Sequence, residues 1–312
     1  MPELPEVETT ARGLRERLLG RKIVTVGSLD WPRMAPNASV ELLAQTAIGR
    51  TIESIARRGK YVIVGLSGDA YLVLHRKMSG NLVLRTTDLP IAAHTHLTVT
   101  FDDGWRLDFV DPRKFGRIYL FLGRDALDTF LDERLGPEPL EIERVDLDAL
   151  LERRRGRLKA LLLDQSFLAG IGNLYADEIL WEARLHPERS VESLSARERG
   201  RLHDAIQYVL STAIERRGTS LSDYVDADGE QGTNQDFLQV YGRAGLPCPR
   251  ETCGRPIVRV VVAQRGTWFC PTCQPVVARR RRVARTTRSH AGPTPGGGAR
   301  RPRSSIASAP GR

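Results

Sequence analysis

The chain has 312 residues, of which 41% are hydrophobic, and this length predicts about two domains with apolar cores of their own. No run of about 18 apolar residues occurs, which excludes a transmembrane helix, and the N-terminus lacks the basic and apolar segments of a signal peptide. We therefore expect a soluble cytoplasmic protein that does not bind membranes.

The net charge of +9 comes from the C-terminal end of the chain. Ten arginines and no acidic residue follow residue 273, and subtracting them from the 47 basic residues leaves 37 against 38 acidic ones. If the nearly neutral body binds nucleic acid, its basic residues must gather on one face. Because residues 275–312 are rich in Arg, Pro, Gly and Ser, we expect a disordered tail there.

The first 122 residues predict a helix followed by an antiparallel β-sandwich. An apolar stripe runs through 5–19, with Pro5 in the first turn and Gly20 at the exit. After a strand at 22–30 and a short helix at 39–49, β-branched and alternating patterns recur between turn residues. These patterns predict strands at 51–55, 61–66, 70–74, 81–85, 96–101, 105–110 and 117–122.

A helical part follows an acidic, Pro-containing connection at 123–150. Leucines at helical spacing begin at 147, and a glycine-containing interruption at 169–174 precedes another helix. Ser195 and Glu198 form a capping box before a long amphipathic helix that ends near Gly218. Residues 218–236 are polar and predict a long flexible loop, so the helical domain is expected over 151–236.

All four cysteines of the chain form two close pairs, Cys248-x4-Cys253 and Cys270-x2-Cys273. This spacing, with an insert of hairpin length, is typical of a tetrahedral zinc site with four thiolate ligands. Without a secretion signal, metal binding is favoured over disulfides. Because every ligand is a cysteine, we expect one structural zinc ion that folds a ribbon over 237–274.

The ribbon's predicted strands, 257–263 and 266–269, place Arg265 in the turn between them. An arginine held rigidly at a hairpin tip is suited to bind a phosphate. A solvated turn residue is the alternative interpretation.

The N-terminus combines an amine nucleophile with an acid. If Met1 is removed, Pro2 presents a secondary amine with an ordinary pKa near ~8, so part of it is neutral and nucleophilic at cellular pH. Glu3 stands beside it to transfer protons. Alternatively, Pro2 and Pro5 merely begin a helix with Glu6 in its first turn.

A glycine-rich segment, 170–173, opens a helix and predicts exposed backbone N–H groups aimed at an anion such as a DNA phosphate. An ordinary connection between helices is the alternative. Five basic residues just upstream favour the phosphate, although they also suit a solvated helix face: Arg153, Arg154, Arg155, Arg157 and Lys159.

Two turns carry large side chains among polar residues, Met78 within 75–80 and Arg113 and Phe115 within 111–116. Such side chains can enter a DNA duplex and fill the space left by an extruded base. Ordinary packing in a surface turn is the alternative.

Together these segments resemble the formamidopyrimidine-DNA glycosylase / endonuclease VIII family of base-excision repair enzymes. The resemblance covers residues 1 to about 274 and includes Pro2-Glu3, 58–61, 77–80, 111–116, 170–178, 239–243 and the cysteine ribbon, in the family's order. It implies an α+β fold with an N-terminal catalytic helix and β-sandwich domain (1–122), a helix-two-turns-helix DNA-binding domain with a lesion loop (151–236) and the zinc ribbon. It also implies a monomer that binds damaged double-stranded DNA.

The resemblance implies a bifunctional enzyme that removes oxidised purines and then cuts the strand as an AP lyase. Pro2 would attack C1′ and form a Schiff base, Glu3 would donate a proton as the sugar opens, Lys60 would assist β-elimination, and Arg265 would bind phosphate and assist δ-elimination. The residues implied to contact DNA are His94, Arg113, Arg155 and Asn173, with Met78, Arg113 and Phe115 filling the void.

Three alternatives stay open at this stage. Lys60 carries a primary amine and is a second candidate nucleophile. The enzyme can act on oxidised pyrimidines, as the endonuclease VIII branch does. A non-catalytic zinc-ribbon DNA-binding protein would use the same ribbon but has no need for Pro2, Glu3 and Lys60.

Overall fold

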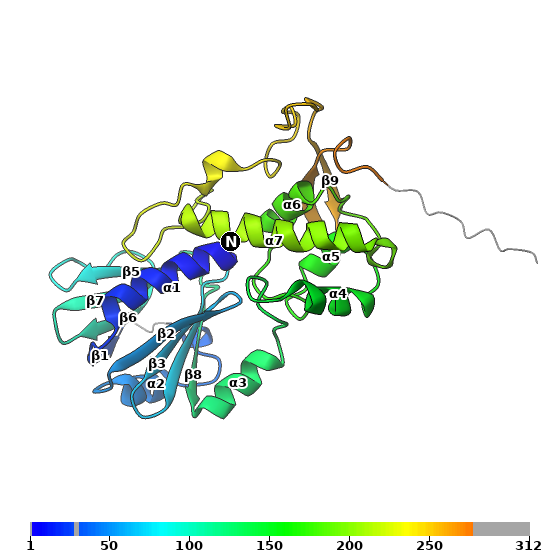
Figure 1. Ribbon diagram of the computed structural model, residues 1–312. Coiled ribbons are helices and arrows are strands. Elements are labelled where there is room, and N and C mark those ends of the chain that lie inside the picture. Colours follow the sequence, from blue (N-terminus) through cyan, green and yellow to red (C-terminus); the bar gives the residue numbers. More distant parts are fainter. Residues whose placement is uncertain (1, 28–30, 277–312) are drawn as a thin grey trace, which may run out of the picture. The chain divides into compact units, whose positions relative to one another are not determined.

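The computed structural model describes residues 2–27 and 31–276. Its N-terminal part is a sandwich of two four-stranded antiparallel sheets, with strand orders β1-β6-β7-β5 and β2-β3-β4-β8 (Figure 1). All eight predicted strands are present, and residues 28–30 of the first lie outside the described residues. The strands are β1 (Ile23–Gly27), β2 (Ile52–Arg58), β3 (Tyr61–Leu66), β4 (Ala70–His75), β5 (Asn81–Thr86), β6 (Thr95–Phe101), β7 (Trp105–Val110) and β8 (Arg117–Leu122).

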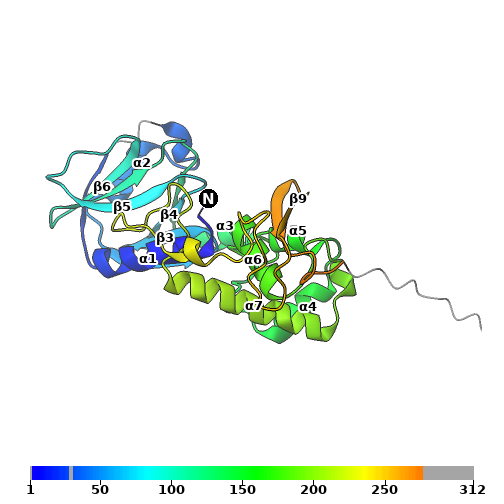
Figure 2. The same ribbon diagram turned by 90° about the horizontal axis from the view of Figure 1, so that it is seen from above.

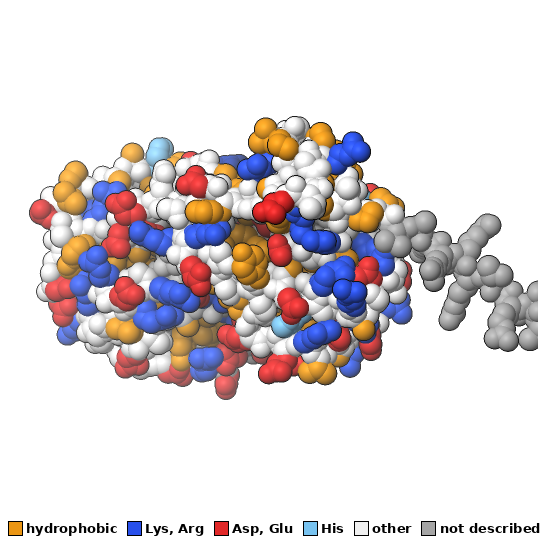
Figure 3. Space-filling view, turned by 45° about the horizontal axis from the view of Figure 1, so that its top comes forward, with side chains coloured by type: hydrophobic (Ala, Val, Ile, Leu, Met, Phe, Trp, Pro, Cys, Tyr) orange, Lys and Arg blue, Asp and Glu red, His pale blue; other side chains and the backbone are white. Residues whose placement is uncertain are grey.

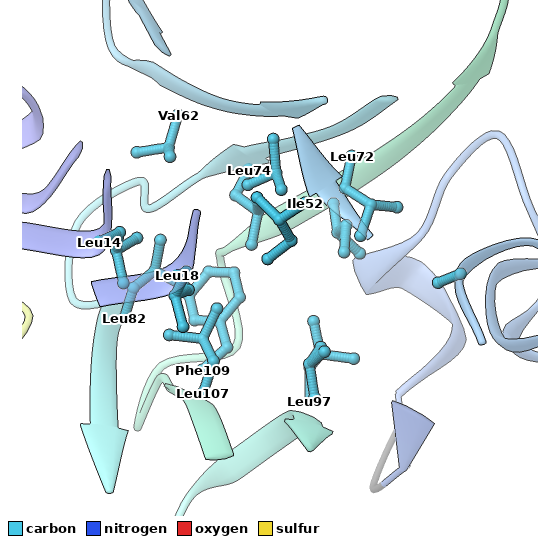
Figure 4. Packing of buried hydrophobic residues seen from close by; sticks show 14 of the residues in the cluster. Leu14, Leu18, Ile52, Val62, Leu72, Leu74, Leu82, Leu97, Leu107 and Phe109 are labelled. Atoms are coloured by element: carbon cyan, nitrogen blue, oxygen red, sulfur yellow. The ribbon is translucent and has the colours of Figure 1, made fainter. Parts of the chain in front are cut away.

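Helix α1 (Leu4–Leu18) closes one edge of the sandwich core. Leu14 and Leu18 are fully buried and lie beside Leu82 and Phe109, between the two sheets (Figure 4). Burial of a leucine or phenylalanine side chain contributes about 1.5–3 kcal/mol, so this contact firmly fixes the helix that carries the N-terminus. The smaller elements of this part are α2 (Val40–Ala47) and the 3-10 helix η1 (Pro32–Met34).

The predicted connection, 123–150, contains a helix that the sequence pattern did not reveal, α3 (Arg124–Asp132). Leu127 and Leu131 are buried with Ile63 and Val73 on the outer face of a sheet. Two leucines in an otherwise polar segment are a weak periodic signal, and packing on the sheet supplies the rest.

The helical part has an apolar core of its own. Its elements are α4 (Arg144–Glu152), α5 (Leu158–Leu162), α6 (Asn173–Glu182), η2 (Val191–Ser193), α7 (Ala196–Glu215) and η3 (Asn234–Phe237). The predicted capping box of Ser195 and Glu198 is confirmed at the start of α7. Helices α1 and α7 lie side by side (Figures 1 and 2).

The ribbon consists of β9 (Val258–Val262) and β10 (Arg265–Phe269). Its turn is the pair Ala263 and Gln264, both with positive φ, as a two-residue hairpin of this hand requires. Arg265 was predicted in the turn, but it begins β10 and pairs with Val262.

No helix of the described ranges is long and apolar enough to cross a membrane. The predicted disordered tail, 275–312, lies outside the described residues from 277 onward.

Candidate active site

The N-terminus lies in a pocket of about 120 Å³. Pro2 and Glu3 line it together with Met78, Asn173 and side chains of the loop that follows α7. Pro2 itself is buried. The pocket thus collects residues that are far apart in the sequence around the predicted nucleophile.

The Glu3 carboxylate is fixed by the N-terminus of α6. It accepts hydrogen bonds from the backbone N–H groups of Gly172 at 2.7 Å, Leu174 at 2.9 Å and Tyr175 at 3.3 Å. The positive end of the helix dipole favours a carboxylate at this place. The prediction that these N–H groups are exposed to bind a DNA phosphate is wrong, because the anion at the helix start is Glu3.

The two glycines before α6 make room for the N-terminal segment. Gly170 has φ +92° and accepts a hydrogen bond from the backbone N–H of Leu4 at 3.0 Å. A Cβ atom on Gly172 would lie 2.3 Å from Cδ of Glu3. Any larger residue at 172 would therefore displace the catalytic candidate.

Glu6 ties the same segment to the loop after α7. Its carboxylate accepts hydrogen bonds from the Tyr175 hydroxyl at 2.6 Å, the Thr219 N–H at 2.7 Å and the Glu3 N–H at 2.8 Å. Burial raises the pKa of Glu6 above its ordinary value, the Tyr175 hydrogen bond opposes the rise and the nearby charge of Glu3 adds to it. Glu6 is thus more than a first-turn residue of α1.

Lys60 lies in the turn between β2 and β3, with its side chain buried. Its Nζ donates to the carbonyl oxygen of Ile171 at 3.0 Å, next to the glycines that hold Glu3. Burial lowers the pKa of Lys60, while the charges of Glu3 and Glu6 oppose that shift. Lys60 therefore lies against the segment whose backbone positions Glu3.

The four cysteines converge as predicted. Their Sγ atoms all lie within 4.8 Å of one another, with 3.9 Å between Cys248 and Cys273 and 3.5 Å between Cys253 and Cys270. Tetrahedral thiolates at ~2.3 Å from zinc are about 3.8 Å apart, so the arrangement fits one zinc ion. With four protein ligands the site is closed, which makes the zinc structural.

A buried ion pair joins the ribbon to the helices. Lys159 and Asp177 lie 2.7 Å apart, and neither side chain is exposed. Lys159 also donates to the Gly266 carbonyl at 3.1 Å, and Asp177 accepts from the Trp268 N–H at 2.9 Å. Asn173 donates to Gly266 as well, at 3.0 Å. Gly266 and Trp268, which follow Arg265 on β10, are therefore anchored on α5 and α6.

Three protein-family profiles match the chain in order. They are the formamidopyrimidine-DNA glycosylase N-terminal domain over residues 1–118, the formamidopyrimidine-DNA glycosylase H2TH domain over 135–225, and the zinc finger found in FPG and IleRS over 245–276. A formamidopyrimidine-DNA glycosylase of Herpetosiphon aurantiacus is 47% identical over 276 residues, which cover 88% of this chain and 100% of that relative. The chain belongs to the formamidopyrimidine-DNA glycosylase family.

Other members of this family are similar to the chain in sequence and in structure. The enzyme of Chloroflexus aurantiacus is 48% identical over 88% of this chain and 98% of its own length. A Lactococcus lactis FPG mutant bound to Fapy-dG-containing DNA superposes with a TM-score of 0.81 at 39% identity, covering 88% of this chain and 100% of that one. The same values hold for MutM in complex with carbocyclic 8-oxo-G-containing DNA. The predicted α+β glycosylase fold is thereby confirmed.

The turns that carry Met78, Arg113 and Phe115 lie next to each other. The Ser79 hydroxyl donates to Asp111, whose carboxylate also accepts the Gly116 N–H at 2.6 Å. Met78 is 44% exposed and Phe115 40% exposed, and the Arg113 guanidinium lies 4.8 Å from the Phe115 ring centre. Of the three, Met78 lines the pocket, and the exposure of Met78 and Phe115 argues against a role in core packing.

The other two predicted DNA contacts lie on different elements. His94 is exposed, has φ 63°, and its carbonyl accepts the Asp111 N–H at 2.9 Å, which places it at the base of the Arg113 loop. Arg155 is exposed after α4, and its hydrogen bonds go to the carbonyls of Glu152 and Arg154 in its own loop. On the face drawn in Figure 3 basic and acidic side chains are intermixed, in line with the nearly neutral body.

Several residues that organise the site were not singled out from the sequence. Tyr175 and Thr219 fix Glu6, and Asp177 pairs with Lys159. Glu178 accepts the N–H groups of residues 239, 240 and 241 at 2.9, 3.0 and 2.8 Å, and so holds the predicted family segment 239–243. Tyr175, Asp177 and Glu178 lie in the family segment 170–178, but the sequence predicted no role for them.

Proposed function

We propose that this enzyme removes oxidised purines, 8-oxoguanine and formamidopyrimidines, from duplex DNA and then cuts the strand by β,δ-elimination. The observation that carries this proposal is the Pro2-Glu3 terminus, held in a pocket by the N-terminus of α6. The solved relatives bound to Fapy-dG and carbocyclic 8-oxo-G DNA support the lesion class.

In the proposed reaction, the Pro2 amine attacks C1′ of the damaged nucleotide and the bond from C1′ to the base breaks. Glu3 supplies the proton with which the sugar ring opens, and the product is an iminium on Pro2. The iminium acidifies the C2′ proton, so elimination of the 3′ phosphate needs no metal or cofactor. Removal of Met1 is a precondition, because until then the Pro2 nitrogen belongs to an amide.

Lys60 and Arg265 would serve the two eliminations. The buried Lys60 is close to the Glu3 support and would assist β-elimination. The exposed Arg265, next to the anchored Gly266, would bind a phosphate and assist δ-elimination. Pro2 is favoured over Lys60 as the nucleophile because Pro2 lines the pocket, whereas the Lys60 ammonium is directed at the Ile171 carbonyl.

The proposed DNA contacts divide between the two halves of the chain. Met78, Arg113 and Phe115 would fill the space of the extruded base, with His94 beside them. Arg155 and Asn173 would contact the backbone from the helical half. We propose domains at 1–122, 151–236 and 237–274, joined by 123–150. The distinct apolar cores of the sandwich and of the helices support the first division, and Ile142 and Leu147 of the joining segment belong to the helical core.

We further propose that the enzyme acts as a monomer in the cytoplasm, associated with the nucleoid through its DNA substrate. The arginines of 275–312 would add nonspecific DNA affinity that falls with salt. Deletion of the tail should then reduce affinity at low salt and flatten its salt dependence, without a change in the single-turnover rate.

The proposed function is tested by comparing duplexes that contain 8-oxoguanine, formamidopyrimidine or thymine glycol under single-turnover conditions. We expect rapid excision and nicking of the first two. Faster action on thymine glycol would place the enzyme with the pyrimidine-specific relatives, and binding without nicking of any duplex would reject catalysis.

A further inference from the structure

Arg76, in the turn between β4 and β5, is a buried cation to which the proposed reaction gives no role. Its side chain is 1% exposed. Its hydrogen bonds go to neutral acceptors: the Gly80 carbonyl at 2.7 Å, the Thr10 hydroxyl at 2.6 Å, the Asn81 side chain, and the Val225 carbonyl at 3.1 Å. Burial of a guanidinium is costly, so the four hydrogen bonds of this side chain indicate that its position is specific.

One side of Arg76 holds the loop that follows α7. Besides the Val225 carbonyl, the guanidinium contacts the ring of Tyr224, 4.9 Å from its centre. Asn81, itself bound to Arg76, donates to the Asp223 carbonyl at 2.6 Å and accepts the Val225 N–H at 3.3 Å. Asp223 and Tyr224 line the pocket at Pro2.

The other side of Arg76 shapes the turn that carries Met78. Its Nε donates to the Gly80 carbonyl, and the Gly80 N–H donates back to the Arg76 carbonyl at 3.0 Å. Met78 and Gly80 line the same pocket from the side of the sandwich. A planar guanidinium can serve both walls at once, which the single ammonium of lysine does less well.

We propose that Arg76 is a positioning residue that holds the 223–225 wall and the Met78 turn at a fixed separation across the pocket. Its loss then impairs capture of an extruded damaged base more than cleavage at a site that has no base. Pro2, Glu3 and Lys60 remain in place without Arg76, because α6 and the segment before it hold Glu3 and Lys60. This inference rests on the proposed function.

The test measures two single-turnover rates for each variant, excision of 8-oxoguanine and nicking of a duplex with a preformed abasic site. Arg76→Met keeps the length of the side chain and removes its donors. We expect the ratio of excision to nicking to fall about tenfold, because small displacements of substrate-positioning groups cost one to two orders of magnitude. Arg76→Lys, which retains a donor, should restore part of the ratio.

Arg106→Met is the matched control. Arg106 is also a buried arginine of the sandwich, but it pairs with Asp108 at 2.6 Å and its hydrogen bonds lie away from the pocket. This variant should lose stability while the ratio stays unchanged. If Arg76→Met does not fold, Tyr224→Leu, which removes the ring that Arg76 contacts, should lower the ratio in the same direction.

Amide hydrogen exchange gives a second, independent measurement of how firmly Arg76 holds the loop. Amides of 219–226 should exchange faster in Arg76→Met, while those of β9 and β10 keep their wild-type rates. Equal loss of both activities, or an unchanged ratio with unchanged exchange, would overturn the role of Arg76. A wild-type protein that shows neither activity would instead contradict the proposed function itself.

Discussion

The N-terminal segment and the zinc ribbon are both fixed on α6, but different forces hold them. Glu3 is bound by backbone N–H groups at the start of the helix, whereas β10 is bound through the buried pair of Lys159 and Asp177, and the cysteine cluster holds the ribbon itself together. One helix therefore sets the position of the proposed nucleophile, Pro2, relative to Arg265. The first attachment depends on close backbone contact and the second on buried charge, while metal holds the ribbon's own fold.

The largest loss of excision activity is expected when Glu3, or the backbone that holds its carboxylate, is changed. Glu3→Gln should lower single-turnover excision by about 100-fold or more, the usual contribution of a positioned proton donor, while duplex affinity changes little. Gly172→Ala should act similarly, because its Cβ would lie 2.3 Å from Glu3 Cδ.

Gly27→Ala is the control for Gly172→Ala, since the new Cβ at residue 27 would meet only the Thr98 hydroxyl, at 3.1 Å. It should keep nearly wild-type excision. Full activity of Gly172→Ala would show that the Glu3 position is not critical.

The zinc ribbon and the attachment of the N-terminal segment differ in how far they could be predicted from the sequence. Cysteine spacing and the Ser195 capping box act over short distances, and both were predicted correctly. The contact of Glu3 with Gly172 joins residues 169 positions apart, and the glycines alone were equally compatible with a phosphate. The sequence showed that an anion belongs at this helix start, and only the fold could show that the chain provides its own.

The next effect concerns the charge-based attachment. Lys159→Met should destabilise the protein by about 3–5 kcal/mol, because it leaves Asp177 buried without its partner. The double variant Lys159→Met/Asp177→Leu should recover most of that loss. Urea unfolding of the single and double variants measures the loss and its recovery. If the free energy of unfolding of Lys159→Met is within about 1 kcal/mol of wild type, as for a surface substitution, the pair does not have this role.

Removal of zinc should weaken DNA binding by about tenfold or more, because one charge-assisted hydrogen bond contributes ~1.5–3 kcal/mol and Arg265 loses its rigid support. The sandwich should stay folded, as its core contains no part of the ribbon. Chelation followed by readdition of zinc, with affinity and circular dichroism recorded, tests this. Collapse of the sandwich on chelation would show that the two regions are not separable.

The smallest expected effect is a pH dependence of the free energy of unfolding that comes from His75. Burial lowers the pKa of His75 to about 3, and its Nδ1 accepts the Lys77 N–H at 2.9 Å. The unfolded chain binds a proton near pH 6.5 and the folded one does not, so His75 reduces stability as the pH falls from about 6.5 toward 3. We expect His75 to lower the free energy of unfolding by about 1–2 kcal/mol when the pH falls from 7 to 5.

His75→Gln isolates this contribution from that of the carboxylates. Thermal unfolding at pH 7 and pH 5 should show a smaller difference in this variant than in the wild type. An identical difference in both proteins would mean that His75 takes up a proton in the folded state.

The central claim is that the Pro2 amine attacks the damaged nucleotide, and borohydride trapping tests it most directly. The protein without Met1 is incubated with an 8-oxoguanine duplex, reduced, digested and mapped by mass spectrometry. We predict one DNA adduct on the peptide that begins with Pro2, and none when Met1 is retained and the Pro2 nitrogen is an amide. An adduct on the peptide that contains Lys60, or no adduct despite strand cleavage, would contradict the account.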